Sequence, residues 1–383
     1  MVRLGLDIFL EKGYKRVEGQ RIGLVTNMTG VNEKLQPSID LFTEHPAIHL
    51  TALYAPEHGI RGDAKEGQEV SSSIDAKTGL PVYSLYGETR KPSQEMLADV
   101  DVLVFDLQDI GSRYYTYIYT MAYVMEACME YGKKLIVLDR PNPVSGLNME
   151  GNLVEPDVRS FVGLLPIPNR HGMTIGELAW LFKKEFAYAC DLSIVPMEGW
   201  KRRMYFDDTN LFWIPPSPNV PVVDTAILYP GTCLLEGTNV SEGRGTAKPF
   251  EWIGAPFIEG QKLAKVYNDK KIPGVLARPV SFVPTYQKHE GEICGGVQLH
   301  IENRHTLHAL RAGGTLVETI AALYPNQFQF IENENGKYFF DLLAGTKRLR
   351  KYILAGEAEK YIEEGQQELG KFKKTRKKYL LYR

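Results

Sequence analysis

Residues 100–143 read VDVLVFDLQDIGSRYYTYIYTMAYVMEACMEYGKKLIVLDRPNP, and this stretch decides the fold. An apolar run at residues 100–107 is followed by a helical pattern at residues 112–131, which Gly132 ends, and then by a second apolar run at residues 134–138. Strands that alternate with helices form a parallel sheet, because each helix carries the chain back across a face of the sheet. The stretch therefore predicts an α/β fold.

The rest of the first half repeats this alternation. Further apolar runs lie at residues 21–26, 49–55 and 81–85, and helical patterns lie at residues 37–44 and from Thr174 onward. Thr174 and Glu177 have the spacing of a capping box, which marks the start of that second helix. We expect a mostly parallel sheet covered by helices.

A proline-rich segment, IPPSPNVP at residues 214–221, interrupts this rhythm and disfavours both helix and internal strand. We place the domain boundary near it, with an N-terminal catalytic domain at residues 1–222 and a second domain at residues 223–383. In the second half we expect helices at residues 260–269 and 307–324 and extended segments at residues 280–286 and 296–301. This mixture predicts an α+β domain.

Composition and charge argue against several classes of protein. The chain has 383 residues, 44% of them hydrophobic, and a net charge of −2. It lacks the positive charge expected of a nucleic-acid binder and any apolar run long enough to cross a bilayer. The basic stretch at residues 371–383 is most simply a solvated helix or tail. Four widely separated cysteines are expected to be small core residues.

The first twelve residues carry several charged side chains. They lack the continuous apolar segment and small-residue cleavage site of an export signal. The sequence as written therefore favours the cytoplasm, and export is expected only if a leader precedes it.

Polar side chains follow four of the predicted strands. Ligands of open α/β sheets bind outside the carboxyl ends of the strands, so these side chains are candidates for one site. They are Asn27 after the first strand, Glu57, His58 and Arg61 after the second, Asp106, Gln108, Asp109, Arg113 and Tyr115 after the fourth, and Asp139, Arg140 and Asn142 after the fifth.

Some of these residues also fit structural roles. Asp139 and Asn142 could equally organise a turn in the DRPNP run, and Asp109 could cap the following helix. His171 precedes the helix that starts after Thr174 and could face either the site or solvent. Glu57 has no evident structural role, so we favour a functional one. Tyr115 lies beside the strand ends and could stack on a ligand.

The second half contributes one loop of similar character, EGTNVSEGRGT at residues 236–246. Its glycines allow the backbone to approach a ligand closely, and its charged and amide side chains could contact that ligand. The alternative is a plain flexible loop, which the charge content disfavours. The candidates here are Glu236, Asn239, Glu242 and Arg244.

Absent motifs narrow the chemistry. The first strand is not followed by a Gly-x-Gly-x-x-Gly turn, and no Walker-type loop occurs, so no nucleotide cofactor is expected. The Gly-x-Ser-x-Gly elbow and the His-Glu-x-x-His helix are also missing. A site rich in Asp, Glu, Arg and Tyr suits glycoside hydrolysis, in which a carboxylic acid protonates the leaving oxygen and usually a second carboxylate assists.

Four motifs in order, APEHGIRG, FDLQDIGSRYYTY, DRPNP and EGTNVSEGRGT, resemble those of the NamZ-type exo-β-N-acetylmuramidases, long catalogued as a domain of unknown function. The resemblance covers nearly the whole chain. It implies a Rossmann-like N-terminal domain, a smaller C-terminal domain and a cleft between them. It also implies release of N-acetylmuramic acid (MurNAc) from the non-reducing ends of peptidoglycan fragments, which makes MurNAc–GlcNAc saccharides the expected partners.

The residues can be given roles for such a substrate. We expect Glu57 to be the general acid, kept protonated near neutral pH by burial or by neighbouring carboxylates, with His58 orienting it or relaying protons. The partner carboxylate is either Glu242 or Asp106. In a substrate-assisted route, Asp106 or Asp109 would instead hold the acetamido group of the sugar. The lactyl carboxylate of MurNAc calls for a cation, for which the candidates are Arg113, Arg140 and Arg244.

Two alternatives remain from the sequence. One is a metal-dependent hydrolase with ligands among His58, Asp106, Asp109, Asp139 and His171. The other is a non-catalytic protein that binds cell-wall sugars in the same cleft. We rank it last, because sugar binding needs aromatic and amide groups more than a concentration of carboxylates.

Overall fold

The computed structural model describes residues 2–57, 59–60, 73–87 and 89–383. Its N-terminal part is built on a seven-stranded sheet with the order β3-β4-β2-β1-β5-β6-β7. All neighbouring strands from β4 to β7 are parallel, and only β3 is antiparallel to its neighbour β4. The strands are β1 (Arg21–Thr26), β2 (His49–Ala55), β3 (Ser73–Ile74), β4 (Pro81–Ser84), β5 (Val102–Asp106), β6 (Lys134–Leu138) and β7 (Asp191–Val195).

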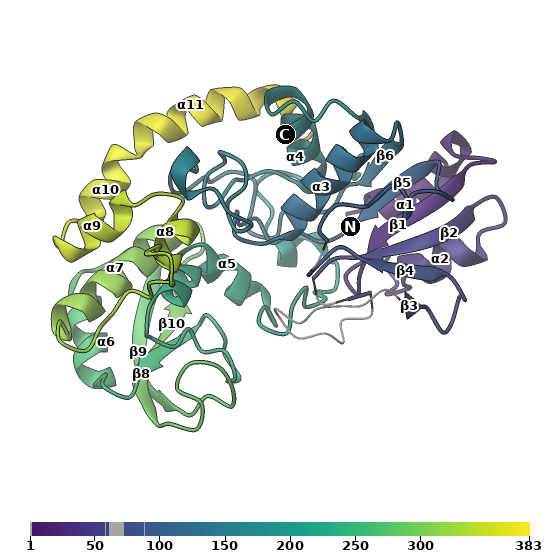
Figure 1. The fold of residues 1–383 in the computed structure, drawn as a ribbon. Coiled ribbons are helices and arrows are strands. Elements are labelled where there is room, and N and C mark those ends of the chain that lie inside the picture. The colour runs from purple at the N-terminus through teal and green to yellow at the C-terminus, as the bar shows by residue number, and fades with distance from the viewer. Residues whose placement is uncertain (1, 58, 61–72, 88) are drawn as a thin grey trace.

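Helices cover both faces of this sheet (Figure 1). Alternate residues of β5 explain why: Val102 and Val104 belong to one hydrophobic cluster, and Leu103 and Phe105 belong to another. The first cluster includes residues of α1 (Gly5–Glu11) and α2 (Ser38–Glu44). The second includes residues of α3 (Tyr117–Glu130) and α4 (Ile175–Glu185). The expected α/β fold is confirmed.

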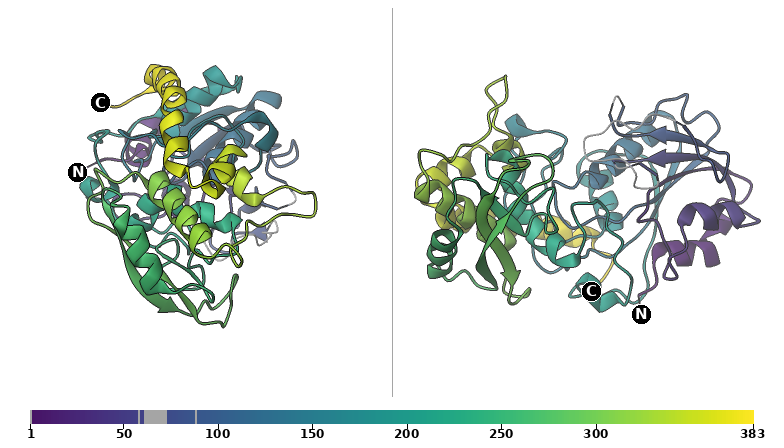
Figure 2. Two further views of the ribbon diagram at one scale, coloured as in Figure 1. Left: turned by 90° about the vertical axis from the view of Figure 1, so that its left-hand side faces the viewer. Right: turned by 90° about the horizontal axis from the view of Figure 1, so that it is seen from below.

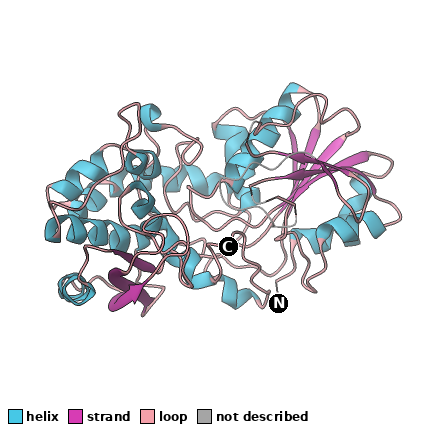
Figure 3. Cartoon of the chain, turned by 60° about the horizontal axis from the view of Figure 1, so that its bottom comes forward, coloured by secondary structure: helices cyan, strands magenta, loops and turns pink. Residues whose placement is uncertain are grey.

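The C-terminal part contains a three-stranded antiparallel sheet with the order β8-β10-β9, formed by β8 (Trp252–Ala255), β9 (Val275–Phe282) and β10 (Cys294–Ile301). Its helices are α5 (Val223–Thr232), α6 (Gly260–Asp269), α7 (Ala309–Leu323), α8 (Phe339–Ala344), α9 (Arg348–Leu354) and α10 (Ala358–Glu364). The two sheets lie at opposite ends of the molecule, with irregular segments between them (Figure 3). The expected smaller α+β part is confirmed.

Helices α5 and α7 meet at two glycines. A Cβ atom on Gly313 would lie 2.2 Å from the carbonyl oxygen of Gly231, and one on Gly231 would lie 1.8 Å from that of Ala309. Glycine at both positions therefore lets the two backbones touch.

The chain then returns to the N-terminal part through α11 (Gln366–Arg376), the yellow helix that runs toward α4 in Figures 1 and 2. The guanidinium of Arg376 is buried and donates to the carbonyl oxygens of Gly146 and Gly172, at 3.1 and 2.8 Å. The basic stretch is thus not a wholly solvated tail, because Arg376 and the residues after it pack on the N-terminal part.

Several predicted elements match the structure closely. Strands β1, β2 and β6 and helix α6 have the predicted bounds, and the capping box at Thr174 and Glu177 is formed. Helix α3 begins only at Tyr117, because residues 107–116 form the irregular segment that reaches the site. Short 3-10 helices lie at Gly13–Arg16 (η1), Pro156–Val158 (η2), Phe206–Thr209 (η3), Cys233–Gly237 (η4) and Lys377–Tyr379 (η5).

The four cysteines are buried and free, as expected. Within the described residues, no helix is long and apolar enough to span a membrane.

Candidate active site

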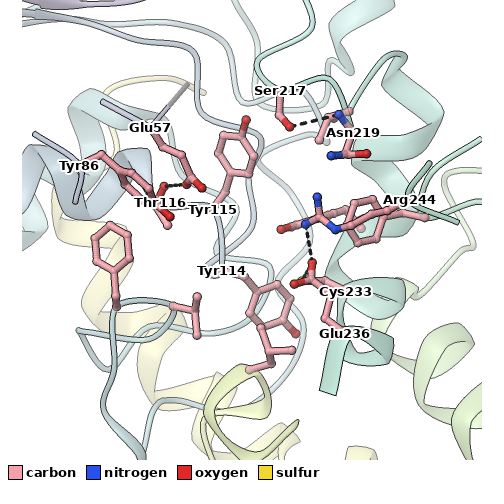
Figure 4. Close-up of a pocket in the computed structure, with 16 residues that line it drawn as sticks. Glu57, Tyr86, Tyr114, Tyr115, Thr116, Ser217, Asn219, Cys233, Glu236 and Arg244 are labelled. Atoms are coloured by element: carbon pink, nitrogen blue, oxygen red, sulfur yellow. Dashed lines mark hydrogen bonds and ion pairs between the residues drawn. The ribbon is translucent and has the colours of Figure 1, made fainter. Parts of the chain in front are cut away.

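A cavity of about 140 Å³ lies where the two parts of the chain meet. Figure 4 shows Glu57 and Thr116 on one side of it and Glu236 and Arg244 on the other. The N-terminal part contributes the segments after β2 and β4, the segment before α3 and residues 161–162. The rest comes from the proline-rich segment, α5, the region around η4 and α8. The lining residues are Glu57, Tyr86, Tyr114, Tyr115, Thr116, Phe161, Val162, Ser217, Asn219, Val220, Tyr229, Cys233, Glu236, Arg244, Phe250 and Leu343.

Glu57 is positioned by a tight turn at the end of β2. The amide of Gly59 donates to the carbonyl oxygen of Pro56 at 3.1 Å, and Gly59 has a φ of +73°, a conformation that glycine adopts without strain. The turn leaves the Glu57 side chain half-buried at the cavity, where its Oε2 accepts a hydrogen bond from Oγ1 of Thr116 at 2.9 Å. A carboxyl group held in this way can act on a bound substrate.

Aromatic residues form the floor beside Glu57. The ring of Tyr115 packs edge-on against those of Tyr117 and Tyr229, with centroid distances of 4.9 and 6.2 Å. Asn27 lies behind them: its Nδ2 donates to the Tyr117 hydroxyl at 2.7 Å, and that hydroxyl donates to the carbonyl oxygen of Pro216, also at 2.7 Å. Burial raises the pKa of Tyr115 well above its usual value, so the phenol stays neutral. Asn27 therefore supports the cavity from behind.

The opposite side holds four charged groups in contact. Arg244 lies 3.0 Å from Oε1 of Glu236 through Nη2 and 3.3 Å from Oε1 of Glu242 through Nε. The ammonium of Lys288 lies 2.9 Å from Oε2 of Glu242 and also donates to the carbonyl oxygens of Leu235, Glu236 and Val240. Glu242 is buried behind the pair, whereas Glu236 and Arg244 reach the cavity.

Other predicted site residues lie away from this cavity, at the strand ends. Asp106 is fully buried and binds Arg140 through two contacts, 2.7 Å to Nε and 2.9 Å to Nη2. Gln108 donates to the carbonyl oxygens of Asp109 and Pro141, both at 2.7 Å. Gln108 and Arg140 line a second, much smaller hollow of about 20 Å³. Neither Asp106 nor Glu242 is among the described residues that line the larger cavity.

Three more candidates organise the loops after β5 and β6. Asp109 accepts from the amide of Gly111 at 2.7 Å and lies 3.2 Å from Nε2 of the buried His171. Asn142 accepts from the amide of Val144 at 3.0 Å, which is the turn-forming role considered for it.

Asp139 is surrounded by hydrogen-bond donors. It accepts from Oγ1 of Thr174 at 2.8 Å, from the amide of Gly176 at 2.8 Å and from the hydroxyl of Tyr382 at 2.5 Å. Even so, burial raises its pKa to about 7. Asp139 therefore ties β6 to the start of α4 and to the end of the chain.

Arg113 and Asn239 join segments of the backbone. Arg113 is completely buried and donates to four carbonyl oxygens at 2.8 to 3.0 Å, those of Asn152, Ile167, Leu343 and Ala344. Asn239 pairs with the backbone of Gln327 and Gln329, at 2.8 and 2.9 Å. His58 and Arg61, also predicted for the site, lie outside the described residues.

Sequence reasoning did not single out several residues that line the cavity. Ser217 and Asn219 lie in the proline-rich segment that was interpreted only as a boundary. The sequence feature that could have indicated their role is the presence of two polar side chains among four prolines. No comparable feature marks Tyr86 and Phe161, because isolated aromatic residues in loops are common. Within the described residues, no group of three or more His, Cys, Asp or Glu side chains could hold a metal ion.

Comparison with known proteins agrees with the two-part architecture. Residues 22–224 match the family model described as "Exo-beta-N-acetylmuramidase NamZ, N-terminal", and residues 227–382 match "Exo-beta-N-acetylmuramidase NamZ, C-terminal". The chain belongs to the NamZ exo-β-N-acetylmuramidase family. The resemblance in its sequence motifs is thereby confirmed. The NamZ match covers the strand-end loops and the loop around Glu236 alike.

NamZ relatives resemble this chain along its whole length. The peptidoglycan β-N-acetylmuramidase NamZ of Bacillus subtilis (strain 168) is 53% identical over 382 residues, which cover 100% of this chain and 91% of that protein. Crystal structures of two DUF1343 family proteins from Bacteroides fragilis NCTC 9343 have the same fold. One has a TM-score of 0.91 at 40% identity and the other 0.79 at 31%; each match covers 100% of this chain and 99% of the other.

Proposed function

We propose that this NamZ-family chain is an exo-acting β-N-acetylmuramidase that releases MurNAc from peptidoglycan-derived MurNAc–GlcNAc saccharides, with Glu57 as the general acid. Membership of the family and 53% identity to a peptidoglycan β-N-acetylmuramidase support the reaction. The observation that supports the role of Glu57 is its place: it lines the cavity at the junction of the two parts and is held by Thr116 at 2.9 Å. A general acid must be held in place by its neighbours and must lie within reach of the glycosidic oxygen of the bound substrate.

Arg244 is the candidate for the lactyl carboxylate of MurNAc. Of Arg113, Arg140 and Arg244, it alone is among the described residues that line the cavity. Its guanidinium lies over the ring of Phe250, 5.1 Å from the centroid, which holds its plane in place. A planar guanidinium can bind a carboxylate through two parallel hydrogen bonds, so Arg244 fits the group that distinguishes MurNAc from N-acetylglucosamine.

We favour the substrate-assisted route for the second catalytic group. Asp106 and Glu242 are held in buried ion pairs, and Glu236, which does line the cavity, is paired with Arg244. The acetamido oxygen of MurNAc can itself attack the anomeric carbon while Glu57 protonates the leaving oxygen. The cavity offers the polar side chains of Tyr115, Ser217 and Asn219 to position that group.

The test compares Glu57→Gln with the unchanged protein on two substrates. A MurNAc–GlcNAc disaccharide needs a proton on its leaving oxygen, whereas a nitrophenyl MurNAc glycoside has a leaving group that departs without one. We expect turnover of the disaccharide to fall by roughly 10²–10⁴-fold and turnover of the nitrophenyl glycoside to fall much less. Glu290→Gln, an exposed change in the C-terminal part, is the matched control. Undiminished turnover of the disaccharide by Glu57→Gln would refute the assignment.

A further inference from the structure

Four charged groups of the described residues lie opposite Glu57, and their charges balance. Glu236 and Glu242 contribute two negative charges, and Arg244 and Lys288 contribute two positive ones, with contacts between 2.9 and 3.3 Å. A ligand carboxylate that approaches Arg244 adds a further negative charge to this partly buried set. Such a charge is unfavourable in a medium of low dielectric constant unless it is compensated.

Of the two carboxylates, Glu236 is the one that can take up a proton and give up its ion pair with Arg244. The Glu242 side chain is 2% exposed and is held by both Arg244 and Lys288. The Glu236 side chain is 19% exposed and lines the cavity, and its one ion pair among the described residues is with Arg244. Protonation of Glu236 would remove one negative charge and release Arg244 from one of its ion pairs.

The surroundings of Glu236 make its carboxylate easier to protonate than an exposed one. Burial raises the pKa of Glu236, against the opposing effect of Arg244, and the neighbouring charge of Glu242 raises it further. Facing it from η4 and α5 are Cys233, whose thiol donates to Oε1 of Glu236 at 3.6 Å, and Tyr229. Burial raises the pKa of both groups, so both stay neutral. Lys288, in the loop before β10, lowers the pKa of Glu236. Glu57 lies across the cavity (Figure 4).

We propose that Arg244 exchanges the carboxylate of Glu236 for the lactyl carboxylate of a bound muramyl residue, and that Glu236 takes up one proton from solvent in the exchange. This inference rests on the proposed function, because it assumes that MurNAc occupies the cavity. It makes Glu236 a specificity-determining residue. A sugar without the lactyl group brings no charge to Arg244 and leaves the Glu236–Arg244 pair intact.

Calorimetry of MurNAc binding tests the exchange without any turnover. Titrations near pH 7.5, in two buffers of different ionisation enthalpy, give the number of protons taken up with each ligand. We expect a number approaching one for MurNAc and near zero for its lactyl amide, which lacks the charge. We also expect MurNAc affinity to fall by up to about tenfold for each pH unit above the pKa of Glu236.

Glu236→Gln keeps the size of the side chain but cannot take up a proton. We expect this variant to bind MurNAc with no linked proton and with an affinity that no longer depends on pH, while Glu290→Gln behaves like the unchanged protein. Lack of proton uptake by the unchanged protein, equal uptake by Glu236→Gln, or lack of measurable MurNAc binding each overturns the proposal. If Glu236→Gln does not fold, the comparison of MurNAc with its lactyl amide decides alone.

The two proposals fail in different ways. Full disaccharide turnover by Glu57→Gln refutes the role of Glu57, yet proton-linked MurNAc binding would remain. Conversely, MurNAc that binds without a proton refutes the exchange at Arg244, and loss of turnover in Glu57→Gln would still support the general acid.

Discussion

The hydroxyl of Tyr382 donates a hydrogen bond of 2.5 Å to Oδ2 of Asp139, which joins two residues 243 positions apart in the sequence. Tyr382 also packs edge-on against Trp200, at a centroid distance of 5.1 Å, and its hydroxyl accepts from the amide of Met197 at 2.9 Å. The segment after α11 is thus fastened to the residue that follows β6, an internal strand of the N-terminal sheet.

Stability should depend on pH through Asp139. Burial raises its pKa from 3.8 to about 7, so between these pH values the folded state keeps a proton that the unfolded state has released. The free energy of unfolding therefore falls as pH rises from about 4 to 7. The side chain of Asp139→Asn cannot titrate, so we expect the free energy of unfolding of this variant to decrease less between about pH 4 and pH 7. Urea unfolding at several pH values measures this decrease. An unchanged pH dependence would contradict the assignment.

Removal of the Tyr382 hydroxyl should loosen the end of the chain. Tyr382→Phe leaves Oδ2 of the buried Asp139 with one donor fewer, so we expect a loss of about 1–3 kcal/mol in the free energy of unfolding. Tyr379→Phe is the control, because its hydroxyl bonds to Glu185 on the surface. Hydrogen exchange at residues 377–383 should accelerate in Tyr382→Phe alone. Equal stability of the two variants would count against this role of the hydroxyl.

Arg113 should matter for stability more than for substrate binding. Arg113→Met leaves four buried carbonyl oxygens without their donor, two of them in the segment at Leu343 and Ala344. We expect a loss of about 3 kcal/mol or more in the free energy of unfolding, measured by denaturant titration. The KM of molecules that remain folded should stay near that of the unchanged protein. A large rise in KM at unaltered stability would instead favour the substrate role first considered for Arg113.

Thr116 should act as a positioning residue for Glu57. Thr116→Val removes the hydroxyl that donates to Glu57 at 2.9 Å, and we expect kcat on the disaccharide to fall by about 5–10-fold with little change in KM. Thr116→Ser keeps a hydroxyl and should recover most of the loss. Failure of serine to restore kcat would point to packing rather than to the hydrogen bond.

The glycine contact between α5 and α7 should tolerate no side chain. Gly313→Ala would place its Cβ 2.2 Å from the carbonyl oxygen of Gly231, so the helices must separate, and we expect a loss of several kcal/mol. Gly314→Ala is the matched control, because nothing lies within 4 Å of its Cβ position. Alanine has a higher helix propensity than glycine, so Gly314→Ala should be as stable as the unchanged protein or up to about 1 kcal/mol more stable. Similar Tm values for both variants would contradict the contact.

The sequence predicted the α/β fold because the internal strands β1, β5 and β6 are buried on both faces over most of their length and are therefore largely apolar runs. Strand β7 was missed because its sequence, DLSIV, begins with Asp191 and includes Ser193, and it lies at the edge of the sheet. Strand β8 was also missed, because its sequence, WIGA, is only four residues long and contains Gly254. Strands with such weak or short sequence patterns are stabilised by neighbouring strands that are distant in the sequence.

The site was harder to predict than the fold. Order along the chain indicated that Glu57, Asp106 and Arg140 lie near strand ends, but it could not indicate that Asp106 and Arg140 neutralise each other. Likewise, two glutamates six residues apart look equivalent, and only the structure shows Lys288 beside Glu242 and the cavity beside Glu236. Which charges pair is decided by tertiary contacts, and these separate the residues at the cavity from those that support it.

The hydrogen bond between Tyr382 and Asp139 also affects when the N-terminal part can complete its folding during synthesis. A ribosome that adds roughly 5–20 residues per second makes Asp139 about 12 to 50 seconds before it makes Tyr382. Throughout that interval the nascent sheet holds a carboxyl group whose tyrosine partner does not yet exist. The N-terminal half therefore cannot reach its final structure as an independent early unit, and its maturation waits for the segment that follows α11.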